Sequence, residues 1–463
     1  MMVQSSVTKS NTSSHQKQST DPLKVLLCEL LVHIFCIWIQ DALDDPSTDL
    51  EYNSLTQLPT SLCRVSKSWR DFVYACPVLW TYITIEASEG VVTDLPVFQE
   101  RLKRSQSAPL FVNVIVGEHP HKDALRVLFA ECSRFRQLAL EVLDMSWLRD
   151  FPMKGFTQLE HLVVMDMNTE APAHKDELGA VFSSAPRLRR VEWHSASDPG
   201  SITVIGHQLH FLDLSATHLP ITCVLKILAA CPNLRRAAIF MDRYEQVPAP
   251  LIERVLLPDL CSLYLTGTRH IARILGCIRA PQLRCLDAHW TQYDGRAQDL
   301  ESLGAFLEYS PHLVDIALQG FLQIEDGLIN IIMNNKNLTS LSVTGKSSDS
   351  SPRKLITERT FKLLTRQEGG EYGLPRLEKL VFRCGLDVPD EVVLRMIESR
   401  MSPPGDSSGS RGASTLKYIC LDRCKPMAVE SISRLWAMYQ ENGLKVEGAF
   451  ANPNQPRYIY LDF

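Results

Sequence analysis

The chain lacks the features that mark most catalytic and metal-binding proteins. Its 463 residues contain no phosphate-binding loop, dinucleotide-binding turn, nucleophile elbow or zinc-protease motif. Thirteen cysteines are present, but none forms a Cys-x-x-Cys pair. They stand singly in apolar stretches, as at Cys36, Cys223 and Cys231, which is typical of buried free thiols in a reducing compartment. The sequence therefore predicts a protein that is not an enzyme, with no metal and no cofactor.

Strong charge and a long apolar segment are also missing. The formal net charge of −5 does not favour nucleic-acid binding, which requires a basic surface. The most apolar run, residues 23–39, is interrupted by Lys24, Glu29 and His33 and is shorter than the ~20 residues of a membrane-spanning helix. Residues 1–21 are polar, so we expect them to be disordered and to carry no secretion signal. We expect a soluble intracellular protein of the cytoplasm or nucleus, with no nucleic-acid or membrane partner.

Two helical signals lie before residue 80. Leu62, Val65, Trp69 and Phe72 recur at the spacing of one helix face, and residues 26–35 form a second, more apolar pattern. A small all-α module is therefore expected near the N-terminus.

The segments around these helices have simpler interpretations. The acidic stretch 41–56 predicts a surface loop between the two helices. Pro77 ends the second helix because proline cannot continue it, and residues 80–85 then alternate like a strand.

The residues of this N-terminal region resemble the F-box, a three-helix module, in the form found in F-box proteins of fungal genomes. The first half of the family pattern, Leu-Pro-x-Glu-Leu-Leu-x-x-Ile-Phe, is matched by Leu26, Glu29, Leu30, Leu31, Ile34 and Phe35, with Leu27 in place of proline. The second half is matched by Leu62, Val65, Ser66, Trp69, Arg70, Pro77, Leu79 and Trp80. The resemblance covers residues 22–85.

The F-box resemblance implies a partner. F-box modules dock on a Skp-family adaptor (S-phase kinase-associated protein) and through it on a cullin, forming an SCF-type ubiquitin ligase. By that resemblance the adaptor-binding residues are Leu26, Leu30, Ile34, Leu62, Val65 and Trp69.

A second pattern, Leu-x-x-Leu-x-Leu with related apolar residues, recurs through the rest of the chain. Its first positions are Phe135, Leu159, Leu188, Leu209, Leu234, Leu260, Leu283, Leu313, Leu338, Leu377 and Leu416. Most steps resemble the 20–29 residues of a leucine-rich repeat, and the last two are lengthened by Ser- and Gly-rich inserts. Helical patterns separate the repeats, as at 222–228, 271–275, 300–307 and 392–397.

Such units bury their apolar faces only by stacking on one another. The fold class predicted for residues 86–463 is therefore an α/β solenoid, right-handed and leucine-rich-repeat-like, with a parallel sheet on its concave face. A strand at 110–116, a helix at 95–103, a terminal helix at 429–439 and a closing strand at 444–446 complete the expectation.

The residues between and just after the repeated leucines are expected to point away from the core. They give a candidate substrate-binding face made of Glu192, His194, Asp213, Tyr264, Asp287, His289, Trp290 and Arg383. Several are acidic or aromatic, so we hypothesise a groove for a basic or extended segment of another protein. The alternative is an ordinary solvated sheet face. Trp290 is the most informative of the set because aromatic side chains dominate interface energetics.

Three functions remain open. The favoured one is the substrate-recognition adaptor of an SCF-type ubiquitin ligase, which contributes proximity rather than catalysis. The second is a leucine-rich-repeat binding scaffold without a ubiquitin link, in which residues 22–85 cap the open end of the solenoid. The third is an enzyme with an unrecognised site, which predicts a deep pocket with convergent ionisable groups.

Overall fold

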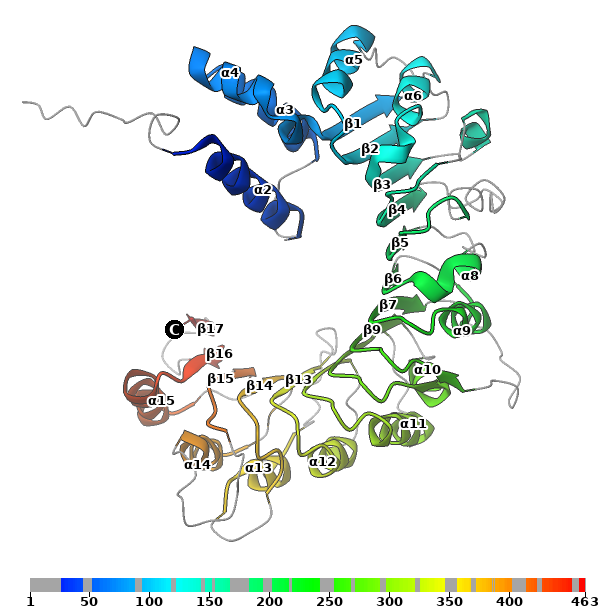
Figure 1. The fold of residues 1–463 in the computed structure, drawn as a ribbon. Helices are drawn as coiled ribbons and strands as arrows, with labels where there is room; N and C mark the ends of the chain where they lie inside the picture. The colour runs from blue at the N-terminus through cyan, green and yellow to red at the C-terminus, as the bar shows by residue number, and fades with distance from the viewer. Residues whose placement is uncertain are drawn as a thin grey trace, which may run out of the picture. The chain divides into compact units, whose positions relative to one another are not determined.

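The structure of this protein is a computed structural model of the full chain (Figure 1). It describes residues 26–44, 52–87, 94–117, 122–142, 146–151, 155–166, 183–194, 202–215, 219–241, 254–267, 271–291, 297–320, 325–345, 356–367, 372–384, 386, 388–401, 414–422, 427–451 and 458–462. The predicted disorder of residues 1–21 lies outside these ranges. The chain divides into unit 1, Met1–Thr84 with Asp94–Phe111, and unit 2, Ile85–Thr93 with Val112–Phe463.

Unit 1 is helical. Its elements are α2 (Cys28–Asp44), α3 (Tyr52–Cys63), α4 (Lys67–Ala75), the 3-10 turn η1 (Pro77–Trp80) and α5 (Leu95–Arg104). The prediction of a loop over 41–56 was wrong at both ends, because α2 continues to Asp44 and α3 begins at Tyr52.

The single helix expected around Leu62–Phe72 is also divided. Ser66 has extended backbone angles, φ −162° and ψ 172°, and its hydroxyl accepts a hydrogen bond from the Trp69 amide at 3.2 Å. It is therefore the N-cap of a new helix, and the apolar stripe read along one helix spans two.

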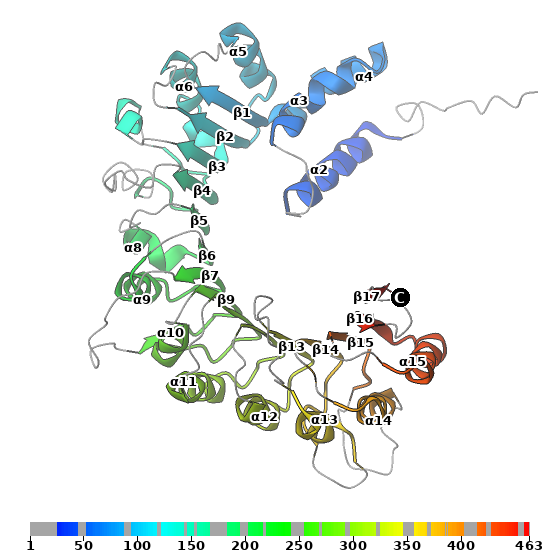
Figure 2. The same ribbon diagram turned by 180° about the vertical axis from the view of Figure 1, so that it is seen from behind.

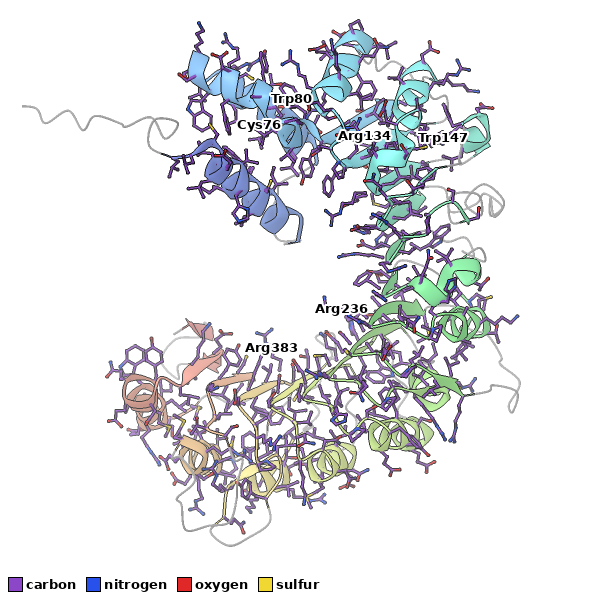
Figure 3. The ribbon with its side chains drawn as sticks, in the orientation of Figure 1. Cys76, Trp80, Arg134, Trp147, Arg236 and Arg383 are labelled. Atoms are coloured by element: carbon purple, nitrogen blue, oxygen red, sulfur yellow. The ribbon has the colours of Figure 1, made fainter. Side chains whose placement is uncertain are left out.

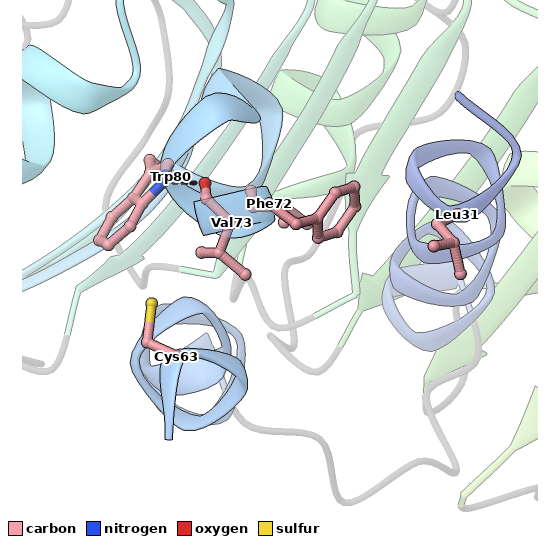
Figure 4. Packing of buried hydrophobic residues seen from close by; sticks show 6 residues of the cluster. Leu31, Cys63, Phe72, Val73 and Trp80 are labelled. Carbon is pink, nitrogen blue, oxygen red and sulfur yellow. Dashed lines mark hydrogen bonds between the residues drawn. The ribbon is translucent and has the colours of Figure 1, made fainter. Parts of the chain in front are cut away.

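The core of unit 1 forms where α2, α3, α4 and η1 meet. Leu31, Cys63, Phe72, Val73, Leu79 and Trp80 are buried together in one cluster. In Figure 4, Leu31 of α2 lies across from Phe72 of α4, and the Trp80 indole donates a hydrogen bond of 2.9 Å to the Val73 carbonyl. A second cluster of Ile39, Leu55 and Tyr82 holds the later turns of α2. One face of α2 is thus fixed by its own unit.

Helix α5 packs on this unit through arginine side chains, one of which stacks on aromatic rings. The Arg104 guanidinium lies 3.8 Å from the centre of the Tyr74 ring and 5.0 Å from that of Trp80. Arg101 donates to the Tyr82 carbonyl at 2.9 Å. Burial lowers the pKa of Arg101 to about 10, which still leaves it charged at neutral pH.

Two strands cross the boundary between the units. They are β1 (Tyr82–Ala87) and β2 (Leu110–Val116). The helix predicted at 95–103 and the strand at 110–116 are confirmed. The strand expected at 80–85 begins two residues later, because Pro77–Trp80 forms η1.

Unit 2 is a long sheet of parallel strands, one for each sequence repeat and one more, β16 (Lys445–Ala451), after the last repeat. From β3 the order is that of the chain: β3 (Phe135–Val142), β4 (His161–Asp166), β5 (Arg190–His194), β6 (Phe211–Leu214), β7 (Arg236–Met241), β9 (Ser262–Gly267), β11 (Cys285–Trp290), β12 (Asp315–Gln319), β13 (Ser340–Thr344), β14 (Lys379–Arg383), β15 (Tyr418–Asp422) and β16 (Lys445–Ala451).

The strand register places equivalent repeat positions side by side. Leu263 pairs with Leu286, and Leu286 pairs with Ile316. These side chains are buried, so stacked aliphatic columns form the core of unit 2.

Helices connect the strands, which is the connection that parallel strands require. The bounds are α6 (Lys122–Phe129), α8 (Ile202–Ile205), α9 (Ile221–Ala230), α10 (Ile271–Cys277), α11 (Ala297–Glu308), α12 (Glu325–Asn334), α13 (Glu358–Leu364), α14 (Asp390–Met401) and α15 (Val429–Asn442). Short 3-10 turns lie at η2 (Cys132–Arg134), η3 (Ser146–Asp150) and η4 (Gly206–Gln208). Within unit 2 the helices lie along the convex side and the strands along the concave side (Figures 1 and 2).

Two features were not predicted from the sequence. Strands β8 (Val255–Leu256) and β10 (Ile278–Arg279) form a separate parallel pair. At the C-terminal end, β17 (Tyr458–Asp462) runs antiparallel to β16. No helix among the described residues is both long and apolar enough to cross a membrane.

Candidate functional site

The first candidate surface is an apolar strip on α2. Leu30, Ile34, Ile37 and Trp38 recur every three or four residues of α2, so they share one face, and Leu27 directly precedes the first turn of the helix at the same spacing. All five are exposed, with exposed fractions of 69%, 49%, 50%, 48% and 42%. Soluble proteins rarely leave a contiguous apolar surface uncovered without a function. We call these five residues the α2 strip.

A polar line borders the strip on the same helix. Glu29 and His33 are both exposed and lie one turn apart. Helix α2 thus has three faces: one packed into unit 1, one polar, and one apolar but uncovered.

The structure separates the six residues predicted to bind an adaptor into two groups. Leu26, Leu30, Ile34 and Val65 are exposed, Val65 at 63%. Leu62 and Trp69 are partly buried against the core cluster. The Trp69 ring meets Phe35 and Phe72 edge-on, with centroid distances of 6.2 and 6.1 Å. Leu27, Ile37 and Trp38 were missed, although their helical spacing was visible in the sequence.

The second candidate surface is the helix-free face of the sheet in unit 2. Glu192 and His194 lie on β5, and Glu192 pairs in register with Asp213 on β6. Tyr264 of β9 pairs with Asp287 of β11, which also carries His289. Arg383 lies at the end of β14. The register therefore brings the predicted residues together as two groups and leaves Arg383 apart.

Glu192 is the centre of the first group. Its Oε1 atom accepts hydrogen bonds from Arg190 Nε at 2.7 Å and from His161 Nε2 at 3.0 Å. His194 Nε2 lies 3.6 Å from the other carboxylate oxygen. The sequence did not indicate His161 as a partner, because it meets Glu192 only through the strand register. Arg190 lies two residues before Glu192 on the same strand, so its spacing was visible in the sequence but was not used.

Within this group, hydrogen bonds and neighbouring charges favour the ionised forms of Glu192 and His194. Burial raises the pKa of Glu192, but hydrogen bonds from His161 and His194 and the charge of Arg190 outweigh burial and hold that pKa far below its usual range. The bond to Glu192 raises the pKa of His194 against the opposing effect of burial, and Asp213 adds to the rise. The negative charge of Glu192 is thus neutralised within the chain.

The second group is less fully bonded. Burial raises the pKa of Asp287, His289 lowers it, and Asp315 raises it further. Its Oδ1 atom is buried with no hydrogen-bond partner in the described part of the chain. The Tyr264 ring beside it is exposed.

A third set of polar residues lies on the same face, and apart from Arg383 its members were not predicted from the sequence. The Tyr418 hydroxyl of β15 donates to Glu447 of β16 at 2.5 Å, and Lys445 Nζ lies 3.0 Å from the same carboxylate. Burial raises the pKa of Tyr418, and the bond to Glu447 adds to the rise. Arg383 Nε donates to the Cys420 sulfur at 3.4 Å. The sequence gave no signal for these pairs beyond their positions in the repeats.

The prediction that Trp290 belongs to this face was wrong. Its exposed fraction is 0%, and it alternates in phase with the buried residues Leu286 and Ala288. Successive side chains of a strand point to opposite faces, so Trp290 lies on the core side. It extends the buried column instead of the binding face.

A pocket of about 270 Å³ lies between α11 and α12. Leu303 and Ile331 contribute to its wall with Asn330 and Asn334, and among the described residues Glu308 is the one ionisable side chain that lines it. Convergent ionisable groups, which an active site requires, are not found there. Within the described residues, no three His, Cys, Asp or Glu side chains are placed to hold a metal ion.

Comparisons with known proteins give distant likenesses. No protein-family model matches the chain, and no curated protein matches it. An internalin of Listeria monocytogenes is similar over 51% of this chain and 68% of its own, with 13% identity and a TM-score of 0.32. A leucine-rich-repeat protein of Leptospira interrogans is similar over 89% of this chain and 98% of its own, with 12% identity and a TM-score of 0.34.

Likenesses this weak leave the fold to be judged from the strands themselves. Their order, their parallel register and their stacked aliphatic columns are those of a leucine-rich-repeat-like α/β solenoid, preceded by a small helical unit.

Proposed function

We propose that the chain is a protein-binding adaptor, the substrate-recognition subunit of an SCF-type ubiquitin ligase. Unit 1 binds a Skp-family adaptor, and through it a cullin, while the concave sheet of unit 2 holds a protein substrate. The observation that carries this proposal is the α2 strip of Leu27, Leu30, Ile34, Ile37 and Trp38. The role is proximity: the substrate is held where another protein transfers ubiquitin.

The α2 strip has the energetic properties of a docking surface. Full burial of one large apolar side chain contributes about 1.5–3 kcal/mol. Because the strip residues are about half exposed, covering all five contributes roughly 4–7 kcal/mol before the cost of association. Val65, exposed at 63% between α3 and α4, adds a further apolar contact in the same unit.

Co-purification with a Skp-family adaptor tests this function. Leu30→Asp and Ile34→Asp change exposed positions, so we expect the folded chain to persist while the complex is lost. Glu29→Lys and His33→Asp change the polar line of the same helix and serve as matched controls. We expect the two controls to retain the adaptor at 0.5 M salt, since apolar contacts are not screened by ions.

If the wild-type chain fails to bind the adaptor, the ligase assignment is wrong. The same holds if the control variants lose the complex as completely as Leu30→Asp does. Circular dichroism and melting curves of all four variants establish that each is folded.

The second candidate function is a binding scaffold without a ubiquitin link. Leu27 favours it, because this residue stands where the F-box pattern has proline. This function is supported if the wild-type chain does not bind the adaptor but the Leu27→Pro variant, which restores the family residue, does bind it.

A further inference from the structure

A row of arginines lies along the N-terminal edge of the sheet in unit 2. Arg189, Arg235 and Arg284 stand immediately before β5, β7 and β11, and all three are exposed. Their backbones continue the ladder of hydrogen bonds across the intervening strands: the Arg235 amide donates to His210 and the Arg284 amide to Cys261, at 2.8 and 2.9 Å. We call Arg189, Arg235 and Arg284 the arginine row.

The same ladder position is neutralised at both ends of the row. Arg136 donates to Glu160 at 2.9 Å on one side, and Lys417 pairs with Glu378 at 2.7 Å on the other. Each of these cations thus has an acidic neighbour on the next strand. Opposite charges alternate there. Glu160 also adjoins Arg189 on the ladder, but no acidic residue stands between the members of the arginine row at this position.

The side chains of the row keep their positive charge uncompensated. Arg189 donates to the carbonyl groups of Leu188 and Gln208, which carry no net charge. Within the described structure, the side chains of Arg235 and Arg284 make no hydrogen bond and no ion pair. The same is true of Arg236, which is exposed at the start of β7 and is labelled in Figure 3.

The pKa of His210 reflects the electrostatic potential around the arginine row. It lies between Arg189 and Arg235 on the ladder, and burial lowers its pKa first, followed by the charges of those two arginines. Asp259 opposes the shift without reversing it. The region is therefore positive in sum.

The spacing of the row indicates the shape of its partner. Neighbouring strands lie about 4.8 Å apart, so arginines on alternate strands are roughly 9.6 Å apart. Three residues of an extended chain in the polyproline II conformation span about 9 Å and bring every third side chain back to the same face. The arginines form a line and do not converge on one point, which suits a series of single negative charges better than one phosphate group.

We propose that the arginine row is the docking surface for an extended acidic segment of another protein, with Asp or Glu at about every third residue. This deepens the proposed function, because it names the class of substrate that the sheet holds. It also reverses the hypothesis of a basic segment. The acidic residues Glu192 and Glu447 are bonded within the chain, and along the arginine row the charge left available is positive.

Fluorescence anisotropy with the full chain tests the proposal. The probe is a labelled peptide of about 12 residues, long enough to span the row, with Glu at every third position among Ser and Gly. Matched peptides carry Gln or Lys at those positions. We expect the Glu peptide to bind about tenfold more tightly than either, with an affinity that falls as salt rises.

Two double variants locate the contact. Arg235→Gln with Arg284→Gln removes two charges from the row, and we expect at least about fivefold weaker binding of the Glu peptide. Arg136→Gln with Lys417→Gln removes two charges from the same ladder position outside the row, and we expect less than about twofold. Equal losses in the two double variants overturn the proposal, because they show a response to net charge alone.

Other ligands give the remaining contrary outcomes. Tighter binding of a single-stranded oligonucleotide of equal charge, or of a peptide with one phosphoserine, overturns an acidic segment as the occupant. No binding of the Glu peptide at low salt does the same. Failure here is distinct from failure of the ligase assignment, since the peptide assay contains no adaptor and the arginine variants leave the α2 strip intact.

Discussion

Helices α2 and α14 show how differently the two units use apolar side chains. Helix α14 in the array buries Val393, Leu394, Met396 and Ile397, and it has α13 and α15 as neighbours. The longer α2 buries Leu31 and Ile39 and leaves the α2 strip exposed. A solenoid helix is packed by its own repeats, so its apolar residues stabilise the fold. In α2 the apolar residues exceed what its own unit covers, which leaves a surface for another molecule.

The largest expected effect is a loss of unfolding free energy at Arg400, and it tests whether α14 is fully packed within unit 2. Arg400 of α14 is fully buried, and its guanidinium donates to the carbonyl groups of Leu364, Gly373 and Leu374 at 2.5–2.9 Å. Arg400→Met leaves these carbonyl groups without their donor, so we expect a loss of about 3–5 kcal/mol in unfolding free energy. Urea unfolding measures it.

The matched control for Arg400 is Arg395→Met, on an exposed turn of the same helix. We expect less than about 0.5 kcal/mol from it. Similar losses of unfolding free energy in the two variants would show that α14 is packed no more completely than α2.

The next effect separates the two faces of α2. Leu31 is 5% exposed and Leu30 is 49% exposed, although they are adjacent in the sequence. We expect Leu31→Ala to destabilise unit 1 by about 2–4 kcal/mol through the cavity it leaves. Leu30→Ala should cost less than about 1 kcal/mol while weakening any complex made through the α2 strip. Thermal unfolding monitored by tryptophan fluorescence distinguishes them, and equal costs would mean that the strip is part of the core.

A third prediction concerns how neighbouring repeats cap one another. Glu325 of α12 accepts hydrogen bonds from the amide and hydroxyl of Thr357 at 2.9 and 2.8 Å, and from those of Thr360 at 3.2 and 2.5 Å. These donors begin α13. We expect Glu325→Gln to cost about 1–2 kcal/mol in urea unfolding at pH 7. Asp326→Asn, which removes an exposed pair with Arg359, should cost less than about 0.5 kcal/mol.

The pH dependence of the Glu325 contribution has a definite sign. Burial raises the pKa of Glu325, but its hydrogen bonds from Thr360 and Thr357 outweigh burial and lower the pKa. The contribution is therefore present above the unfolded pKa of about 4.3 and is lost as the pH falls through the folded value. The difference between wild type and Glu325→Gln should shrink on acidification, and a difference that grows would contradict this bonding.

The smallest effect tests whether the sheet face neutralises its own acidic residues. Because Glu192 raises the pKa of His194, we expect His194 to titrate above its ordinary value of 6.5 by NMR. Its contribution to stability is present below the unfolded pKa and is lost as the pH rises through the folded one. Glu192→Gln should lower the His194 pKa and cost less than about 1 kcal/mol. Glu160→Gln, which removes a partner of Arg136, should leave His194 unchanged.

The sequence predicted the body of unit 2 well because its signal is periodic. Strand β3 begins at Phe135, and in every later repeat up to Leu416 the strand begins two residues after the first repeat position. The helices expected at 222–228 and 392–397 are confirmed. The same pattern gave a wrong prediction for Trp290, because residues just after the repeated leucines were assigned to the open face of the sheet. Counting the alternation two residues further would have placed it in the core.

The candidate surfaces were predicted less completely than the fold. Leu30, Ile34 and Val65 were identified by resemblance to a motif and are exposed, but the motif does not distinguish them from Leu62 and Trp69, which pack inward. The charges of the sheet face were read one residue at a time. That His161 contacts Glu192, while Arg235 and Arg284 make no ion pair within the described residues, depends on strand register, which joins residues far apart in the chain.

By itself, the amino-acid order determined the repeat, the strand-and-helix alternation and the apolar composition of α2, because these depend on residues close together in the chain. Tertiary structure alone decided which face of α2 is covered and which charges on the sheet meet a partner. Burial and neutralisation are properties of neighbours in space. The repeats supply those neighbours to every strand and helix of the array, while one side of α2 is left without them.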